Sequence, residues 1–213
     1  MKSLKRISSG FLIAVCCMIA VHAQENSESE TAKKMNRFSF MIGAAAGNFE
    51  ISEPKFTTIY SNRTISRIYF AGIGTNAIYI VGKYREFSAT GRSIVENVTV
   101  EGQSDWKQKF YCVGFRIHSD NHPLYAEVLY VLTRIEESIT TKDLVVQELT
   151  AKEEAENKGA GISAGISLKI AGPFRIFVEG EYDIMMRKDR NQYGRANPEL
   201  GGFCVSAGAQ FAL

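Results

Sequence analysis

The chain is poor in the residues and spacings that most often carry enzyme chemistry. It has three histidines and four cysteines, and no CxxC, HExxH, P-loop or calcium-loop spacing occurs in it. These absences remove the usual signatures of zinc, redox, nucleotide and calcium sites. Residues 159–164 match a G-x-G-x-x-A dinucleotide pattern, but they neither follow a predicted strand nor open a helix. The sequence therefore predicts no cofactor, no metal site and no catalytic group.

The chain also lacks a long apolar run. Residues 11–21 are apolar, but a helix that spans a bilayer needs roughly 20 such residues. Three basic residues precede this run, and Val21-His22-Ala23 follows it with the spacing of a cleavage site. We therefore expect residues 1–23 to be a signal peptide for export and Gln24 to begin the mature chain.

Without residues 1–23 the chain has almost no net charge and few cysteines. Its 22 basic and 23 acidic residues give a formal charge of −1, so we expect no nucleic-acid partner. Only Cys112 and Cys204 remain. The strand assignment below places them on opposite walls of a barrel, beyond the roughly 7 Å between Cα atoms that a disulfide tolerates, so two packed thiols are expected. An alternative lipoprotein interpretation would use Cys16 or Cys17, but Val15 is bulky for that processing.

What the chain does have is a strict alternation of apolar and other residues. Residues 24–36 are polar, and we expect a flexible N-terminal segment there. From residue 37 onward, apolar residues recur at every second position, which is the period of a β-strand. The predicted strands are 37–47, 65–74, 77–87, 107–119, 124–137, 159–170, 174–186 and 200–213. Residues 37–213 are therefore predicted to be all-β, with eight antiparallel strands joined as successive hairpins.

The predicted connections alternate between short and long. Short turns lie near residues 75, 120 and 171, and the longer connections are 48–64, 88–106, 138–158 and 190–199. In an up-and-down barrel this places every short turn and both termini at one end. Short periplasmic turns and long extracellular loops are typical of transmembrane barrels. The sequence therefore predicts an eight-stranded antiparallel up-and-down transmembrane β-barrel.

The chemistry of the polar faces decides which side of the barrel meets lipid. In Phe174–Met186, uncharged residues alternate with a face that carries Arg175, Glu179, Glu181 and Asp183. A soluble lipocalin-like carrier would place such a face outside, but several polar faces here consist of Gly, Ser, Ala and Gln, which suit a narrow lumen better. Buried charges persist when they are paired. The predicted lumenal charge network is Lys83, Arg85, Arg116, Glu127, Lys169, Arg175, Glu179, Glu181 and Asp183.

These features, with the signal peptide and a final alternating strand over Gly202–Leu213, resemble the small outer-membrane β-barrel (porin-like) family of the OmpX and OmpA-transmembrane-domain type. Members of that family often end in an aromatic residue, whereas this chain ends Phe211-Ala212-Leu213. The resemblance implies a place in the bacterial outer membrane, without a cofactor. It also implies contact with outer-membrane lipid and with the outer-membrane assembly machinery, and a monomer.

Function is then expected in the loops that the barrel holds, or in envelope integrity. Contacts with lipopolysaccharide phosphate are one hypothesis and a solvated rim is the other, because the last long loop carries Arg187, Lys188, Arg190 and Arg195. A narrow channel is an alternative function, and a lipid-modifying enzyme is a further one. His118 and His122 lie at the predicted short-turn end, away from the outer leaflet, so we expect no Ser-His chemistry on lipid.

Overall fold

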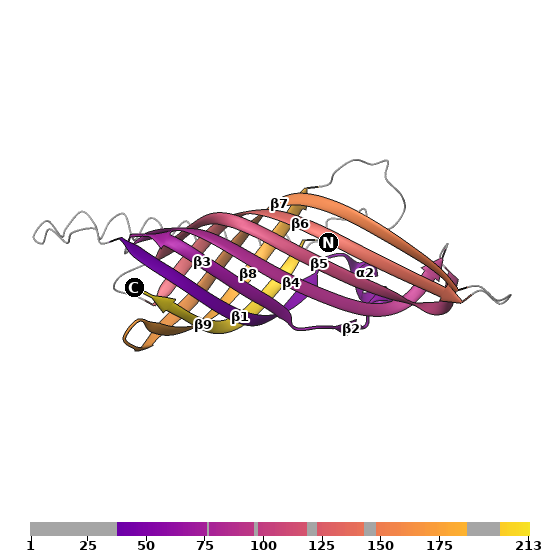
Figure 1. Cartoon of the computed structure of the whole chain (residues 1–213), viewed down its shortest axis with the longest axis horizontal. Coiled ribbons are helices and arrows are strands. Elements are labelled where there is room, and N and C mark those ends of the chain that lie inside the picture. Colours follow the sequence, from indigo (N-terminus) through magenta and orange to yellow (C-terminus); the bar gives the residue numbers. More distant parts are fainter. Residues whose placement is uncertain (1–37, 76, 96–97, 119–122, 143–147, 187–200) are drawn as a thin grey trace, which may run out of the picture. The chain divides into compact units, whose positions relative to one another are not determined.

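The computed structural model describes residues 38–75, 77–95, 98–118, 123–142, 148–186 and 201–213, which form one barrel (Figure 1). The predicted signal peptide and residues 24–36 lie outside the described residues. The barrel strands are β1 (Ser39–Ile51), β3 (Ser66–Gly74), β4 (Ile78–Val95), β5 (Val98–His118), β6 (Leu124–Lys142), β7 (Glu148–Ala171), β8 (Phe174–Met186) and β9 (Gly202–Ala212). A short helix, α2 (Pro54–Ile59), and a two-residue strand, β2 (Asn62–Arg63), connect β1 to β3.

Eight strands close into a single antiparallel sheet. Their order is β4-β3-β1-β9-β8-β7-β6-β5, and pairing of β4 with β5 closes the ring. The two-residue β2 lies beside β4 through Asn62 and Thr90. Within the residues that the structure describes, no helix is long and apolar enough to cross a bilayer. The predicted eight-stranded up-and-down barrel is confirmed.

The short turns that the sequence predicted lie at one end of the barrel, where the chain also closes on itself. Phe40 N donates to Leu213 O at 3.2 Å, and Leu213 N donates to Phe40 O at 2.9 Å, so β1 and β9 stay paired to the last residue. At the turn between β7 and β8, Gly172 has φ = 52°, a left-handed conformation that glycine adopts without steric penalty. The asymmetry of transmembrane barrels predicts that this end faces the periplasm, and we call it the periplasmic end.

Two of the predicted long loops are instead mostly strand, and the prediction is corrected there. The 88–106 segment continues β4 to Val95 and resumes as β5 at Val98, and the 138–158 segment belongs largely to β6 and β7. The sequence of these segments lacks a regular apolar alternation, but β-branched residues stay frequent and support continued pairing. The 48–64 segment holds the end of β1, α2 and β2. Residues 190–199 lie outside the described part.

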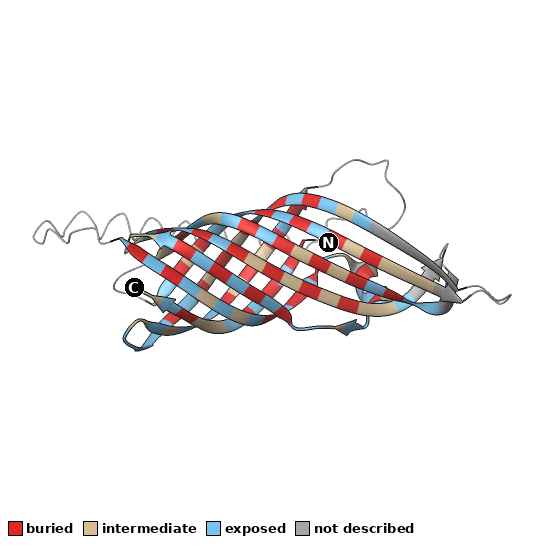
Figure 2. Cartoon of the chain, viewed as in Figure 1, coloured by how far each residue is buried: buried red, intermediate tan, exposed pale blue. Residues whose placement is uncertain are grey.

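Buried and exposed residues alternate along the strands (Figure 2), and the exposed residues change from apolar to polar from one end of the barrel to the other. Toward the periplasmic end an exposed apolar side chain occurs on every strand, for example Ile42, Ile73, Ile80, Val113, Val128, Ile166, Val178 and Val205. Outward-facing tyrosines follow, and the rings of Tyr84 and Tyr111 lie 5.5 Å apart, as in an interfacial aromatic girdle. Further along, outward positions hold Glu50, Ser88, Arg134 and Glu154. The apolar band meets lipid, and strands β4–β7 continue beyond it into water.

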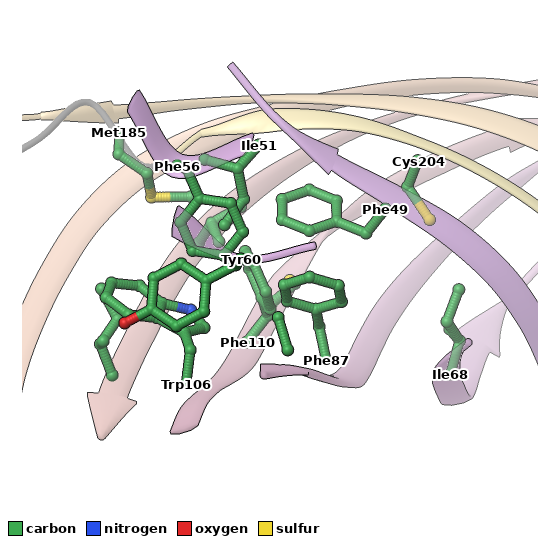
Figure 3. Close-up of a cluster of buried hydrophobic side chains, with 14 of the residues drawn as sticks. Phe49, Ile51, Phe56, Tyr60, Ile68, Phe87, Trp106, Phe110, Met185 and Cys204 are labelled. Carbon is green, nitrogen blue, oxygen red and sulfur yellow. The ribbon is translucent and has the colours of Figure 1, made fainter. Parts of the chain in front are cut away.

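The inner wall has three layers. A lower apolar layer contains Met41, Phe70, Tyr79, Val81, Tyr125 and Phe177. A charged layer lies above it, on β4, β5, β6 and β8. The upper apolar layer, which Figure 3 shows, contains Phe49, Phe56, Tyr60, Phe87, Trp106, Phe110 and Ile135, among others. The charged groups are thus enclosed by apolar side chains on both sides.

Candidate functional site: the lumenal charge network

Lys83 is the centre of the charged layer. It projects inward from β4, and its Nζ donates to Glu127 Oε2 at 2.6 Å, to Glu179 Oε1 at 2.7 Å and to Glu181 Oε2 at 2.7 Å. All four side chains are almost completely buried. An ammonium group has three donors, so each has a carboxylate partner. Oxygens of the three glutamates lie within 4.8 Å of one another, a spacing that could hold a metal ion, but the ammonium takes that central position.

Arg85 connects this centre to the upper apolar layer. Its Nη1 donates to Glu181 Oε1 at 2.8 Å, and its Nη2 pairs with Asp183 Oδ2. The guanidinium carbon also lies 3.9 Å from the ring centroid of Phe110 and 4.6 Å from that of Phe49. A desolvated guanidinium over an aromatic face gains a cation–π attraction. Charge pairing and aromatic packing therefore stabilise the same side chain.

Arg116 makes the equivalent connection to the lower layer. Its Nε donates to Glu127 Oε1 at 2.6 Å and its Nη1 donates to Gln210 Oε1 at 3.0 Å. Its guanidinium carbon lies 4.2 Å from the ring centroid of Tyr125 and 4.9 Å from that of Phe70. The two arginines thus face opposite apolar layers and pair with different carboxylates: Arg85 with Glu181 and Asp183, and Arg116 with Glu127.

The network crosses the lumen. Lys83 and Arg85 lie on β4, whereas Glu179, Glu181 and Asp183 lie on β8, which is the strand opposite β4 in the ring order. An eight-stranded barrel is just wide enough for its side chains to fill the interior. These ion pairs therefore join opposite walls, and together with the aromatic layers they fill the lumen.

The structure brings together seven of the nine predicted lumenal charges: Lys83, Arg85, Arg116, Glu127, Glu179, Glu181 and Asp183. The other two predictions are corrected. Lys169 is exposed, because it lies beyond Ile166, the last residue of β7 that pairs with β6, at the rim of the barrel. Arg175 is half-buried near the periplasmic end, where its Nη1 lies 3.2 Å from His118 Nε2. The predicted surface set, Arg187, Lys188, Arg190 and Arg195, lies outside the described residues.

Three neutral partners of the network were not predicted. Tyr125 Oη donates to Glu179 Oε2 at 2.9 Å, and Ser163 Oγ donates to Glu127 Oε2 at 2.9 Å. Gln210 accepts from Arg116 and donates to Ser167 Oγ at 3.1 Å. Their inward positions follow from strand alternation, but which inward neighbours touch depends on register across the barrel.

The external wall carries its own charge pairs, all on the water-facing side of β4–β7. Lys107 Nζ lies 3.1 Å from Glu86 Oε1, and Lys109 Nζ lies 3.1 Å from Glu136 Oε1. A hydrogen bond from Tyr84 lowers the pKa of Glu86, with Lys107 adding to the effect. A hydrogen bond from Lys109 lowers the pKa of Glu136. Such exposed pairs are individually weak, but they line the extended hairpins with alternating charge.

Comparison with known proteins supports the fold and little beyond it. No protein-family model matches the chain, and no curated protein matches it in sequence. Among solved structures, a major outer membrane protein from Thermus thermophilus is similar with a TM-score of 0.51 at 9% identity, covering 83% of this chain and 100% of that one. Neisserial surface protein A is similar with a TM-score of 0.47 at 12% identity, covering 82% and 96%. The attachment invasion locus protein Ail of Yersinia pestis gives 0.46 at 13% identity, covering 83% and 97%.

The fold, together with an outer wall that is apolar in one part and polar in the other, defines the structural class of this protein. It is a closed eight-stranded barrel with an apolar band around it and charged side chains within it. This architecture, an eight-stranded up-and-down barrel with an apolar outer band, is the one that the sequence predicted, and the solved outer membrane protein from Thermus thermophilus has a similar fold.

Proposed function

We propose that this protein is a sealed, non-enzymatic outer-membrane barrel that acts through its external surface. The observation that carries the proposal is the filled lumen. Lys83 and Arg85 pair with carboxylates on the opposite wall, and Arg116 reaches Gln210 across the lumen, all between two apolar layers. The buried cations and carboxylates are engaged with one another, which is the arrangement of a structural ion-pair network. The side chains that face water in quantity are those of the external hairpins.

The external part of the barrel supports a binding role. Strands β4–β7 continue past the aromatic girdle as a paired sheet, whereas β8, β9, β1 and β3 are shorter (Figure 1). A rigid paired hairpin holds its surface groups in fixed positions, which favours recognition. Its outward side chains include Glu86, Lys107, Lys109, Arg134 and Glu154.

Conductance separates this proposal from the alternative of a narrow channel. The folded barrel in a planar bilayer is expected to show no discrete conductance steps. Variants that disrupt the network, such as Arg116→Ala, should begin to conduct if the ion pairs form the seal. Steady conductance by the unaltered protein would overturn the sealed-barrel part of the proposal.

A hairpin truncation tests the surface role. Thr140–Thr150 can be replaced by Asn-Gly, because Ile139 and Ala151 are paired in register and Asn-Gly favours a tight hairpin turn. In a strain that lacks the native gene, the full-length chain and the truncated chain are compared for envelope permeability and for surface attachment. The truncated chain should return envelope permeability to the level seen with the full-length chain, but it should not restore surface attachment. Full restoration of both would contradict a role for this hairpin.

A further inference from the structure

Glu137 differs from the other buried acids of the barrel. It projects inward from β6 in the upper apolar layer and is 5% exposed. The other buried carboxylates that the structure describes, Glu127, Glu179, Glu181 and Asp183, each pair with a lysine or arginine. No ion pair with a described residue reaches Glu137. Burying a charge without a partner of opposite charge is strongly unfavourable, so this acid calls for a positive partner.

The hydrogen bonds of Glu137 leave one oxygen free. Its Oε1 accepts from Tyr60 Oη and from Ser104 Oγ, the latter at 3.1 Å. Its Oε2 is buried and has no hydrogen-bond partner among the described residues. A buried polar atom without a partner requires a physical cause, and a functional role or a bound water or ion is among the causes found in native proteins.

Aromatic rings surround this acid. Trp106 pairs with Glu137 across β5 and β6, and its ring centroid lies 5.3 Å from that of Phe56 and 5.7 Å from that of Tyr60. Phe56 and Tyr60 stack on each other at 4.5 Å, and Figure 3 shows both rings beside Trp106. A carboxylate among aromatic faces is the chemistry that recognises an organic ammonium group. Calcium would take six to eight oxygen ligands, and the described hydroxyls near Glu137, those of Tyr60 and Ser104, are far fewer.

The segment that supplies Phe56 and Tyr60, Pro54–Tyr60, is short and lies over Trp106 and Glu137. Helix α2 spans only Pro54–Ile59, and so short a helix has little stability of its own. The Tyr60 hydroxyl bonds to the barrel wall at Ser104 and Glu137. A Cβ at Gly91 of β4 would collide with the carbonyl oxygen of Ile59 and would lie 2.9 Å from Tyr60 Cα. Glycine at this position lets the end of the segment lie directly on the wall.

We propose that the upper layer is a binding site for an organic ammonium group, with Glu137 as the anionic partner and Pro54–Tyr60 as its lid. In the closed state the Tyr60 hydroxyl bonds to Glu137 and the rings of Phe56 and Tyr60 cover Trp106. When the lid opens, the ammonium group pairs with Glu137 and contacts the Trp106 face. This site lies inside the barrel wall, and it stands whether or not the external hairpins bind a partner.

Trp106 is the only tryptophan of the chain, so its fluorescence reports this site alone. The probe is benzyltrimethylammonium, titrated into the folded barrel in detergent micelles, with benzyl alcohol as the neutral control. We expect a saturable change in emission with the ammonium probe and none with the alcohol. Glu137→Gln should weaken binding by roughly tenfold or more, because a buried charge pair is lost. An equal response to the alcohol, or unchanged binding to E137Q, would overturn the site.

The lid has its own test. Gly91→Val should displace α2, shift Trp106 emission to longer wavelength and tighten probe binding severalfold, because the closed state no longer competes. Gly82→Val is the matched control on the same strand, since a Cβ there meets nothing within 4 Å. If G91V fails to fold, as judged by heat-dependent gel mobility, Tyr60→Phe removes the hydroxyl and keeps the ring, and it should also tighten binding. Unchanged emission and affinity in the folded variant would exclude a lid, and competition by calcium chloride at low concentration would exclude an ammonium site.

Discussion

The membrane-spanning part of the barrel and its external part differ in the side chains of their outer and inner faces. The first has apolar residues outside and charges inside, and the second has polar residues outside and apolar residues inside. Within the apolar band, Val128 and Val178 face outward, and Glu127 and Glu179 face inward. Above the band on β1, Glu50 faces outward, and Phe49 and Ile51 are buried inside. One continuous strand thus changes from an inside-out pattern to that of a water-soluble barrel. The outer solvent changes from lipid to water at that point, and the alternation of the strand is unaffected.

The two interiors also differ in what stabilises them. The lower interior, which is the interior of the membrane-spanning part and includes the charged layer, depends on directional ion pairs whose partners lie on opposite walls. Removal of one partner therefore leaves others buried and unpaired. The upper interior depends on ring packing, for example Phe49 against Phe87 and Phe110 at centroid distances of 5.4 and 5.1 Å. Arg85 joins the two, because it pairs with Asp183 and lies over both Phe49 and Phe110.

The largest effect is expected for Lys83→Met in the lower interior. Removal of this ammonium leaves Glu127, Glu179 and Glu181 facing one another without it, and loss of one partner from a buried ion-pair network costs about 3–5 kcal/mol. Equilibrium unfolding by urea, with the barrel inserted in lipid vesicles, measures the change. Lys107→Met removes an exposed pair and should change stability by less than about 1 kcal/mol. Similar losses for the two variants would contradict the distinction.

Phe87→Ala tests the ring packing of the upper interior. Phe87 is fully buried against Phe49, and truncation of such a side chain costs about 3 kcal/mol because it leaves a cavity. Ile65→Ala is the control, because Ile65 is exposed beside Ser88 on the external part of the barrel and should change stability by less than about 0.5 kcal/mol, as is usual for a surface position. The same unfolding measurement applies, and the upper layer would be marginal if the control lost as much.

An arginine scan of the outer wall locates the change of solvent. Val128→Arg, in the apolar band, should cost about 2–3 kcal/mol, because the charge meets hydrocarbon. Ser88→Arg, on the external part of β4, should change stability by less than about 0.5 kcal/mol, as is usual for a surface position. Equal effects at the two positions would place both in the same solvent and would refute the assigned boundary.

The smallest effect is expected for the external charge pairs and depends on pH. Folding lowers the pKa of Glu86 and of Glu136 below the ordinary value of 4.5. The unfolded chain therefore binds protons first, so this stabilisation is present at neutral pH and fades as the pH falls below about 4.5. Carboxyl chemical shifts of the two residues should titrate below the usual range, and Lys109→Met should return Glu136 toward it. A Glu136 titration that K109M does not move would remove the pair as the cause.

Much of the fold followed from the sequence because a strand shows its faces by alternation alone. Lys83, Glu127 and Glu179 were predicted to face the lumen for that reason, and the structure places them there. Outward apolar alternation does not predict the extension of β4–β7, because it marks only the part of a strand that faces lipid. Outside lipid the outer face becomes polar and the buried residues, such as Phe87 and Trp106, belong to the inner face. The alternation therefore continues into the extension, but with apolar residues on the inner face and polar residues on the outer face.

The number of strands, the parity of each strand and most of the lumenal charges can be predicted from the sequence, because these depend on local period and turn spacing. Which charges meet depends on the tertiary structure, since contacts such as Lys83 with Glu181 join opposite walls and depend on strand register around a closed ring. The exposure of Lys169 also depends on it, because alternation does not show where the pairing of β6 with β7 ends. The position of α2 over Glu137 likewise follows from packing between segments distant in the chain.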